Sequence, residues 1–327
     1  MQTRVTSARY RWKSWWRWGS NHLEQPVPNG MSVGVIGVGS MGGAIVERLL
    51  GLGYRVAVWD IDRQKMEKSA AKGASPVGSA TELISNHDMV IASLPSPKAV
   101  EETFLNSPLL QAVRPSSITI DMSTVGPKTS RRVYTKFKER NAHYLDAPVS
   151  GGPRRAAAGA LTISVGGDVD AFMRSQSLLR LLGEKVFYVG ESGSGSMMKL
   201  INQLLVFAHS YAAMEALVLS KSLGVDPSKM YEVVTAGSGN SFMFEEMVKL
   251  ILARKVWGGR TELLIKDIVL THQMAAEAGI DLRLCSFLKE TAERMAEEGF
   301  GRDDAVKDFM EYVTHLAGTT RSRTKSP

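Results

Sequence analysis

The 327-residue sequence contains a single cysteine, Cys285. One thiol cannot close an internal disulfide or build a cysteine-based metal site, and it is typical of a reducing compartment. We therefore expect a cytoplasmic protein without a metal. The six histidines show no zinc-binding spacing such as H-E-x-x-H. No stretch holds the roughly 18 consecutive apolar residues of a membrane-spanning helix, and no G-x-S-x-G elbow indicates a hydrolase.

Positive charge is concentrated at the two ends of the chain. The sequence has 40 Lys and Arg against 33 Asp and Glu, but residues 1–20 and 321–327 hold eight of the basic residues and no acid. The body between them has 32 basic and 33 acidic residues. This balance offers no broad electrostatic surface for nucleic acid, so we expect no such partner.

Residues 1–30 form a basic, tryptophan-rich segment ahead of Met31. Its first 20 residues lack acids, as transit peptides do, but the Trp cluster is atypical of them and the segment has no apolar core of a secretory signal. We interpret it as a disordered leader. Residues 319–327 are interpreted as a basic tail.

Residues 31–192 alternate short β-rich runs with helical periods. Several of the runs are continuously apolar, as expected for strands covered on both faces. Strand and helix in alternation predict a parallel, doubly wound Rossmann sheet, an α/β fold. The predicted strands are Val33–Ile36, Arg55–Trp59, Met89–Leu94, Ile118–Ile120, Tyr144–Asp146, Leu161–Val165 and Val186–Val189.

Residues 193–318 read as an all-helical domain. A flexible joint at 190–195 precedes one long helical pattern over 197–223, which Gly224 and Pro227 stop. Its helices carry more apolar residues than the core of one small bundle needs. This excess indicates a homo-oligomer formed through this domain, or alternatively a thick core within one chain. The further predicted helices are 228–236, 241–254, 261–278, 284–298 and 303–316.

The sequence G-V-G-S-M-G at 37–42 has the G-x-G-x-x-G spacing of a dinucleotide-binding turn. It follows an apolar strand and opens a helix, so the glycines allow a tight turn, close approach of a pyrophosphate, and close packing of helix on strand. The unpaired N–H groups at the start of the helix then face the phosphates. The residues expected to hold the cofactor here are Gly37, Gly39, Ser40, Met41 and Gly42.

Asp60 ends the second predicted strand, 23 residues after Gly37, near the distance expected for an acid that binds the adenosine ribose. A carboxylate accepts hydrogen bonds from ribose hydroxyls and repels a 2′-phosphate, which favours NAD over NADP. Arg63 is close enough to reach such a phosphate and leaves NADP as the alternative. Leu94 and Pro95 end another predicted strand, at the sheet edge where such folds bind ligands.

Lys199 follows a glycine-serine loop in the sequence G-S-G-S-M-M-K-L-I-N-Q at 193–203. A phosphate loop needs Gly before the lysine and Ser or Thr after it. Met198 and Leu200 occupy those positions, so a nucleoside triphosphate site is excluded. A solvated lysine at a helix start is the plain alternative to a functional role.

Five motifs in order resemble the β-hydroxyacid dehydrogenase family, which includes 3-hydroxyisobutyrate dehydrogenase and tartronate semialdehyde reductase. The resemblance extends from Val33 to about Phe309. It implies a Rossmann domain joined by a long helix to an all-α domain, and a small hydroxyacid as substrate. The motifs are G-V-I-G-V-G-S-M-G at 34–42, D-M-S-T-V-G-P at 121–127, D-A-P-V-S-G-G at 146–152, the segment at 193–203, and L-I-K-D at 264–267.

Within the family, Lys199 matches the residue that transfers the proton while nicotinamide transfers the hydride. A free lysine is a poor base at neutral pH, but burial beside a cation would lower its pKa toward about 7–8. Thr124 and Lys266 match cofactor contacts. The residues that the resemblance places at the substrate are Ser123, Ser150, Gly151, Gly152, Asn202, Gln203 and Asn240.

The segment A-G-S-G-N-S-F-M-F-E at 236–245 is most similar to the branch that acts on four-carbon sugar acids such as L-threonate. Two positions depart from the family pattern. Gln203 stands where relatives often carry Asn, and Ala99 replaces a cofactor-contacting Asn. The alternatives are a reductase of a small semialdehyde acid that uses NADPH, and a dinucleotide-binding module without activity. An imine-reducing relative is disfavoured because such proteins generally replace the lysine.

Overall fold

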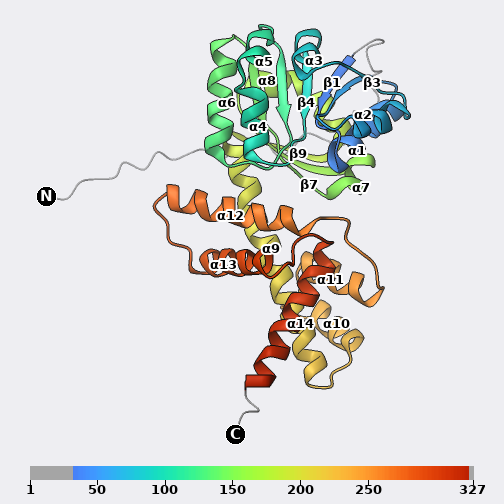
Figure 1. Ribbon diagram of the computed structural model, residues 1–327, viewed down its shortest axis with the longest axis vertical. Coiled ribbons are helices and arrows are strands. Elements are labelled where there is room, and N and C mark those ends of the chain that lie inside the picture. Colours follow the sequence, from blue (N-terminus) through green and yellow to red (C-terminus); the bar gives the residue numbers. More distant parts are fainter. Residues whose placement is uncertain (1–31, 324–327) are drawn as a thin grey trace, which may run out of the picture.

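The computed structural model describes residues 32–323, so the predicted leader and the last four residues lie outside the described part. An α/β domain is followed by an all-helical domain, as the sequence predicts (Figure 1). The strands are β1 (Ser32–Ile36), β2 (Arg55–Trp59), β3 (Ser75–Pro76), β4 (Met89–Ala92), β5 (Ile118–Asp121), β6 (His143–Asp146), β7 (Val149–Ser150), β8 (Leu161–Gly166) and β9 (Gly183–Gly190).

The strands form one sheet in the order β3-β2-β1-β4-β5-β6-β8-β7, with β9 beside β8. The pairs from β2 to β6 are parallel, as expected, and so is the pair of β2 with β3, a strand that the sequence did not predict. The direction then reverses, because β8 runs antiparallel to β6 and β7. The prediction of a wholly parallel sheet is wrong there. Helix α7 (Gly152–Ala157) has only six residues and is too short to return the chain along the sheet before β8 starts.

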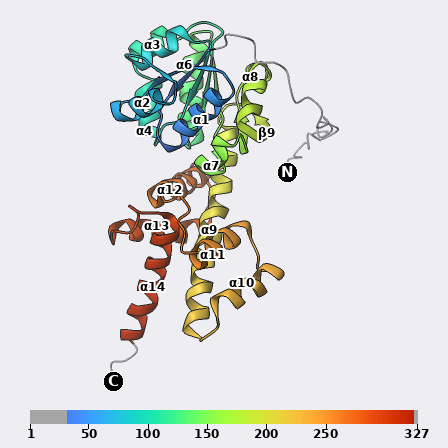
Figure 2. The same ribbon diagram turned by 90° about the vertical axis from the view of Figure 1, so that its right-hand side faces the viewer.

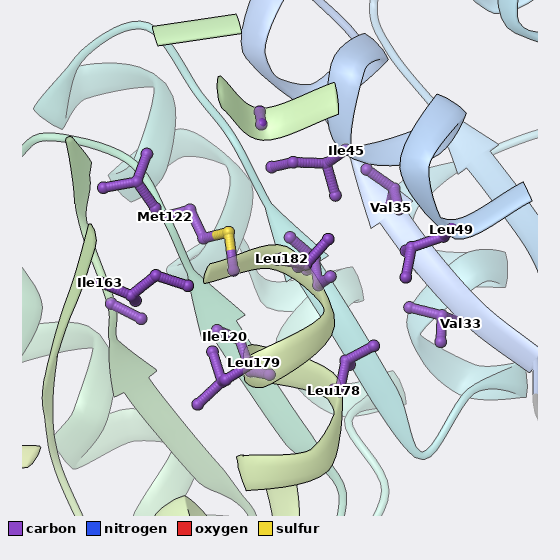
Figure 3. Close-up of a cluster of buried hydrophobic side chains, with 14 of the residues drawn as sticks. Val33, Val35, Ile45, Leu49, Ile120, Met122, Ile163, Leu178, Leu179 and Leu182 are labelled. Atoms are coloured by element: carbon purple, nitrogen blue, oxygen red, sulfur yellow. The ribbon is translucent and has the colours of Figure 1, made fainter. Parts of the chain in front are cut away.

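Helices cover both faces of the sheet. One face packs against α1 and α8, and the buried side chains between them include Val35, Ile45 and Leu179 (Figure 3). The other face packs against α3 to α6 through residues such as Phe104 and Phe137. The helices of this domain are α1 (Ser40–Gly51), α2 (Arg63–Ala70), α3 (Ala80–Asn86), α4 (Pro97–Phe104), α5 (Ser107–Ala112), α6 (Pro127–Glu139), α7 and α8 (Val169–Leu182).

Helix α9 (Ser194–Ser222) links the two domains and is 29 residues long. It leaves the sheet and runs through the helical domain, with α12 lying across it next to the Rossmann domain (Figures 1 and 2). By length and hydropathy alone α9 could cross a membrane, but Phe207 and Met214 on it belong to the helical core. The remaining helices are α10 (Pro227–Ala236), α11 (Phe242–Leu252), α12 (Thr261–Glu277), α13 (Arg283–Glu297) and α14 (Ala305–Arg323).

The junction between the domains is tightly packed, unlike the flexible joint expected from the sequence. Asp146, at the end of β6, accepts hydrogen bonds from the backbone N–H groups of Gly193 (2.8 Å) and Ser196 (2.9 Å). A Cβ on Gly195 would lie 2.2 Å from the Asp146 carbonyl oxygen. Burial raises the pKa of Asp146 to about 6, against the effect of these hydrogen bonds. The carboxylate therefore fixes the start of α9.

Candidate functional site

The glycine-rich turn between β1 and α1 has the shape expected of a phosphate-binding loop. Gly37 has φ +84°, a conformation that side chains disfavour. A Cβ on Gly42 would lie 1.9 Å from the Gly37 carbonyl oxygen, so only glycine allows the helix to approach the strand. A Cβ on Gly39, by contrast, would meet no atom within 4 Å. The open side of the turn is therefore at Gly39, which caps the helix, and Ser40 and Met41 form its first turn.

Asp60 lies beside this turn and is 8% exposed. One carboxylate oxygen accepts the N–H of Val38 at 2.8 Å, and the other accepts the N–H of Asp62 at 2.9 Å. The Lys65 ammonium is 3.9 Å away. The acid predicted to bind ribose therefore also holds the glycine-rich turn in place, a role that the sequence pattern did not indicate.

The loops after β4 and β5 lie together at the carboxyl edge of the sheet. The Ser123 hydroxyl oxygen accepts the N–H of Leu94 at 2.8 Å, next to Pro95. The Ser123 N–H donates to a carboxylate oxygen of buried Asp121 at 2.9 Å. The carbonyl of the next residue, Thr124, accepts a hydrogen bond at 2.7 Å from Lys266 of α12. Residues from both domains therefore meet at this edge.

Lys199 lies in the second turn of α9 and is partly buried. Its Nζ donates to Ser150 Oγ at 3.2 Å and to Gln203 Oε1 at 2.9 Å. Burial lowers the pKa of Lys199 to about 8; the nearby Lys266 lowers it too, whereas Asp267 raises it. The neutral and protonated amines are therefore both populated near physiological pH, as a group that exchanges protons requires.

A chain of polar contacts leads from this amine into α12. Gln203 Nε2 donates to Asp267 Oδ2 at 2.6 Å, and Asp267 Oδ1 lies 2.9 Å from Lys266 Nζ. Asn202 Nδ2 donates to the same Gln203 oxygen that receives Lys199, at 3.2 Å. The residues predicted around Lys199 are thus brought together with Lys266, which is far away in sequence.

Ser150 is the last residue of β7, and two glycines follow it. Gly151 and Gly152 have φ +130° and +71°, which glycine adopts most easily. A Cβ on Gly151 would meet the side chain of Arg155, whereas one on Gly152 would meet no atom within 4 Å. The backbone beside Lys199 is therefore open to a ligand at Gly152.

Residues 32–190 match the family model of the NAD-binding domain of 6-phosphogluconate dehydrogenase. Residues 193–312 match the NAD-binding model of NADP-dependent 3-hydroxyisobutyrate dehydrogenase. The chain is 32% identical to 2-(hydroxymethyl)glutarate dehydrogenase of Eubacterium barkeri over 88% of this chain and 97% of that protein. The chain belongs to the β-hydroxyacid dehydrogenase family. It is therefore an NAD(P)-dependent hydroxyacid dehydrogenase.

Two further relatives cover nearly the whole of this hydroxyacid dehydrogenase. L-Threonate dehydrogenase of Cupriavidus necator is 32% identical over 84% of this chain and 93% of its own length. The structure of Mycobacterium tuberculosis 3-hydroxyisobutyrate dehydrogenase with L-serine superposes with a TM-score of 0.79. It is 27% identical and covers 88% of this chain and 99% of its own.

Among the residues predicted at the substrate, Asn240 is one that the described contacts do not join to Lys199. It lies in the loop between α10 and α11, and its Nδ2 donates to Glu245 Oε1 at 2.6 Å. None of its hydrogen bonds within residues 32–323 reaches the Lys199 group. Within the same residues, no group of three His, Cys, Asp or Glu side chains could hold a metal ion.

Sequence reasoning missed two carboxylates of this hydroxyacid dehydrogenase. Asp267 directly follows Lys266 in the L-I-K-D motif, and Asp146 begins the D-A-P-V-S-G-G motif. Both are buried, at 5% and 1% exposure. A signal was present, because acids rarely occur in apolar surroundings unless they have partners. Apart from Lys266, which is adjacent to Asp267, the partners at or near the start of α9 lie 47 to 64 residues away and cannot be read from the sequence.

Proposed function

We propose that this enzyme interconverts the alcohol of a small hydroxyacid and the matching carbonyl compound, with Lys199 as general acid and base. The observation that carries the proposal is the partly buried amine with a pKa of about 8, bonded to Ser150 beside the open backbone of Gly152. A bound nicotinamide supplies the hydride chemistry. The protein must then move the proton of the alcohol oxygen.

Lys199 is equipped for this proton transfer in both directions. A protonated lysine has three N–H donors, and in the described part of the chain two of them have acceptors, Ser150 and Gln203. The third is available to a substrate oxygen. In alcohol oxidation the neutral amine accepts the hydroxyl proton, and in carbonyl reduction the ammonium returns it. General acid–base catalysis of this kind contributes about 10²–10⁴-fold in rate.

The substrate carboxylate is assigned to the loop at Ser150, Gly151 and Gly152. The two glycines let the backbone come close to an anion, and successive N–H groups in such turns form anion-binding concavities. Ser123 lies at the sheet edge near Leu94. The substrates proposed are 3-hydroxyisobutyrate-like acids or four-carbon sugar acids such as threonate, with Asn240 as a contact to a second hydroxyl. The similarity to L-threonate dehydrogenase supports the second class.

NAD is the proposed cofactor, held at Gly37, Gly39, Ser40, Met41 and Gly42. Asp60 supports NAD over NADP because its carboxylate would lie beside a 2′-phosphate of like charge. The Arg63 side chain is 88% exposed and its Nε lies 3.7 Å from a Glu67 oxygen, so that cation is partly compensated. An NADPH-dependent semialdehyde reductase is the second candidate, which the match to the NADP-dependent family model favours.

The helical domain is the proposed surface for self-association. Helix α10 has no fully buried residue, and apolar side chains of α9, α10 and α11 face solvent. A second copy of the chain would cover them. The most exposed of these apolar residues are Leu219, Leu223, Val233 and Phe242.

We place the enzyme in the cytoplasm, because its cysteine is unpaired and buried.

The test is a panel of hydroxyacids assayed with NAD and with NADP at the absorbance band of the reduced cofactor. Lys199→Ala should lower kcat by at least about a hundredfold while the cofactor Kd stays within a few-fold. Lys221→Ala, at the far end of the same helix, is the matched control and should change neither. Cofactor binding without turnover of any acid would support the inactive module, and equal loss of both properties would show that Lys199 is misplaced.

A further inference from the structure

The amide of Gln203 is bonded at both ends, which fixes its orientation. A carboxylate can only accept hydrogen bonds, so the NH₂ group must face Asp267, at 2.6 Å. The carbonyl oxygen then faces the donors Lys199 (2.9 Å) and Asn202 (3.2 Å). Gln203 is 7% exposed and its amide is occupied by protein partners. Its carbonyl oxygen already accepts two hydrogen bonds, so of the two roles that the family resemblance suggested, orienting the lysine or a substrate hydroxyl, these contacts favour the lysine.

Asp267 is the anchor at the other end of this contact. It is 5% exposed, and besides Gln203 it pairs with Lys266, whose Nζ lies 2.9 Å from its second oxygen. Thr271, one turn further along α12, donates to the carbonyl oxygens of Leu200 (3.2 Å) and of Asp267 itself (2.7 Å). Gln203 and Lys266 therefore hold the carboxylate itself, whereas Thr271 contacts only the backbone at the crossing of α9 and α12.

We propose that Asp267 is a positioning residue for Lys199 and acts through the amide of Gln203. The inference rests on the proposed catalytic role of Lys199. The carboxylate orients the amide, the amide carbonyl holds the amine toward Ser150, and the free N–H of the amine points into the site. Glutamine suits this position because the shorter side chain of asparagine would lose one of the two contacts.

The same arrangement makes Asp267 an electrostatic partner of the amine. The charged groups that face Lys199 are Asp267 and Lys266, both on α12, and its β7 neighbour Ser150 is neutral. Asp267 raises the pKa of Lys199 and Lys266 lowers it. Without the carboxylate, Lys266 is the only charged group among the described residues left facing Lys199, and it lowers the pKa of that amine. The amine should then lose its proton at lower pH, and should also lose its orientation.

Three variants test the inference. Asp267→Asn removes the charge and keeps the shape, and Gln203→Met removes the amide but keeps the ion pair between Asp267 and Lys266. Thr271→Val is the matched control, because it disturbs the same helix crossing outside the chain of contacts to Lys199. Two measurements are made on each full-length protein. One is the pH dependence of Lys199 acetylation by trace acetic anhydride, read by mass spectrometry, and the other is the pH profile of kcat and KM.

For Asp267→Asn we expect the labelling midpoint of Lys199 to fall by about one pH unit, and the pH–rate limb to move with it. For Gln203→Met we expect kcat to fall about tenfold or more while KM for the acid stays within a few-fold. Thr271→Val should keep the wild-type midpoint. If Asp267→Asn fails to fold, Gln203→Met, which also takes the carbonyl acceptor from the amine, should itself lower the midpoint.

An unchanged midpoint in a folded Asp267→Asn protein overturns the inference while leaving the proposed function intact. An equal shift in Thr271→Val also overturns it, because the effect would then be a general consequence of disturbing the helix crossing. If the wild-type protein turns over no acid, yet Asp267→Asn shows the expected shift of the labelling midpoint, the proposed function is refuted and the link between Asp267 and Lys199 is supported.

Discussion

The pH dependence of the two reaction directions provides the sharpest check on Lys199. With a pKa of about 8, the neutral fraction of the amine is about 10% at pH 7 and about 90% at pH 9. Alcohol oxidation needs the neutral amine, so kcat/KM for the acid should rise roughly tenfold over this range. Carbonyl reduction needs the ammonium and should fall by the same factor. The sign is opposite because one group acts as base in one direction and as acid in the other.

The assay follows the reduced nicotinamide band at saturating cofactor, from pH 6.5 to 9.5, in both directions. Lys199→Arg is the matched variant, because a guanidinium keeps its charge throughout this range. Its residual oxidation rate should be low and should lack the limb near pH 8. The assignment of the proton-transfer role to this amine would be refuted if the rates of oxidation and reduction changed in the same direction with pH. It would also be refuted if the rate change near pH 8 persisted in Lys199→Arg.

Three further predictions concern the cofactor turn and the domain junction. Gly42→Ala should prevent normal packing of α1 and lower the thermal unfolding midpoint, because its Cβ would lie 1.9 Å from a carbonyl oxygen; Gly39→Ala, which meets no atom within 4 Å, should keep the midpoint and weaken cofactor binding in a fluorescence titration. Asp60→Ala should raise the affinity for NADP relative to NAD while weakening both, since the carboxylate also holds the turn; an unchanged ratio of the two dissociation constants would contradict its role. Asp146→Asn should lower the free energy of unfolding by about 1–3 kcal/mol in urea titrations, because its NH₂ would face a backbone N–H. A value within error of wild type would show that the clamp on α9 is dispensable.

Much of the cofactor turn could be predicted from local sequence. The spacing of Gly37, Gly39 and Gly42 after an apolar strand defines the shape of the turn locally, although Asp60 also holds it in place. The long helix and the change to an all-helical half also follow from short-range periodicity. The direction of β8 did not follow, because an apolar run is the same in a parallel and an antiparallel pair. The short connection through α7 decided it.

The sequence by itself determined the order of the main strands and helices and the glycine turn, because these features are set by neighbouring residues and by the periodicity of apolar side chains. Its motifs, through their resemblance to a family, indicated Lys199 as the residue proposed to transfer the proton. Only the tertiary structure decided that Asp146 fixes the start of α9 and that Asp267 reaches Lys199 through Gln203. Such contacts join residues far apart along the chain. They form only where packed helices and strands bring buried polar groups together, since those groups must find partners once water is excluded.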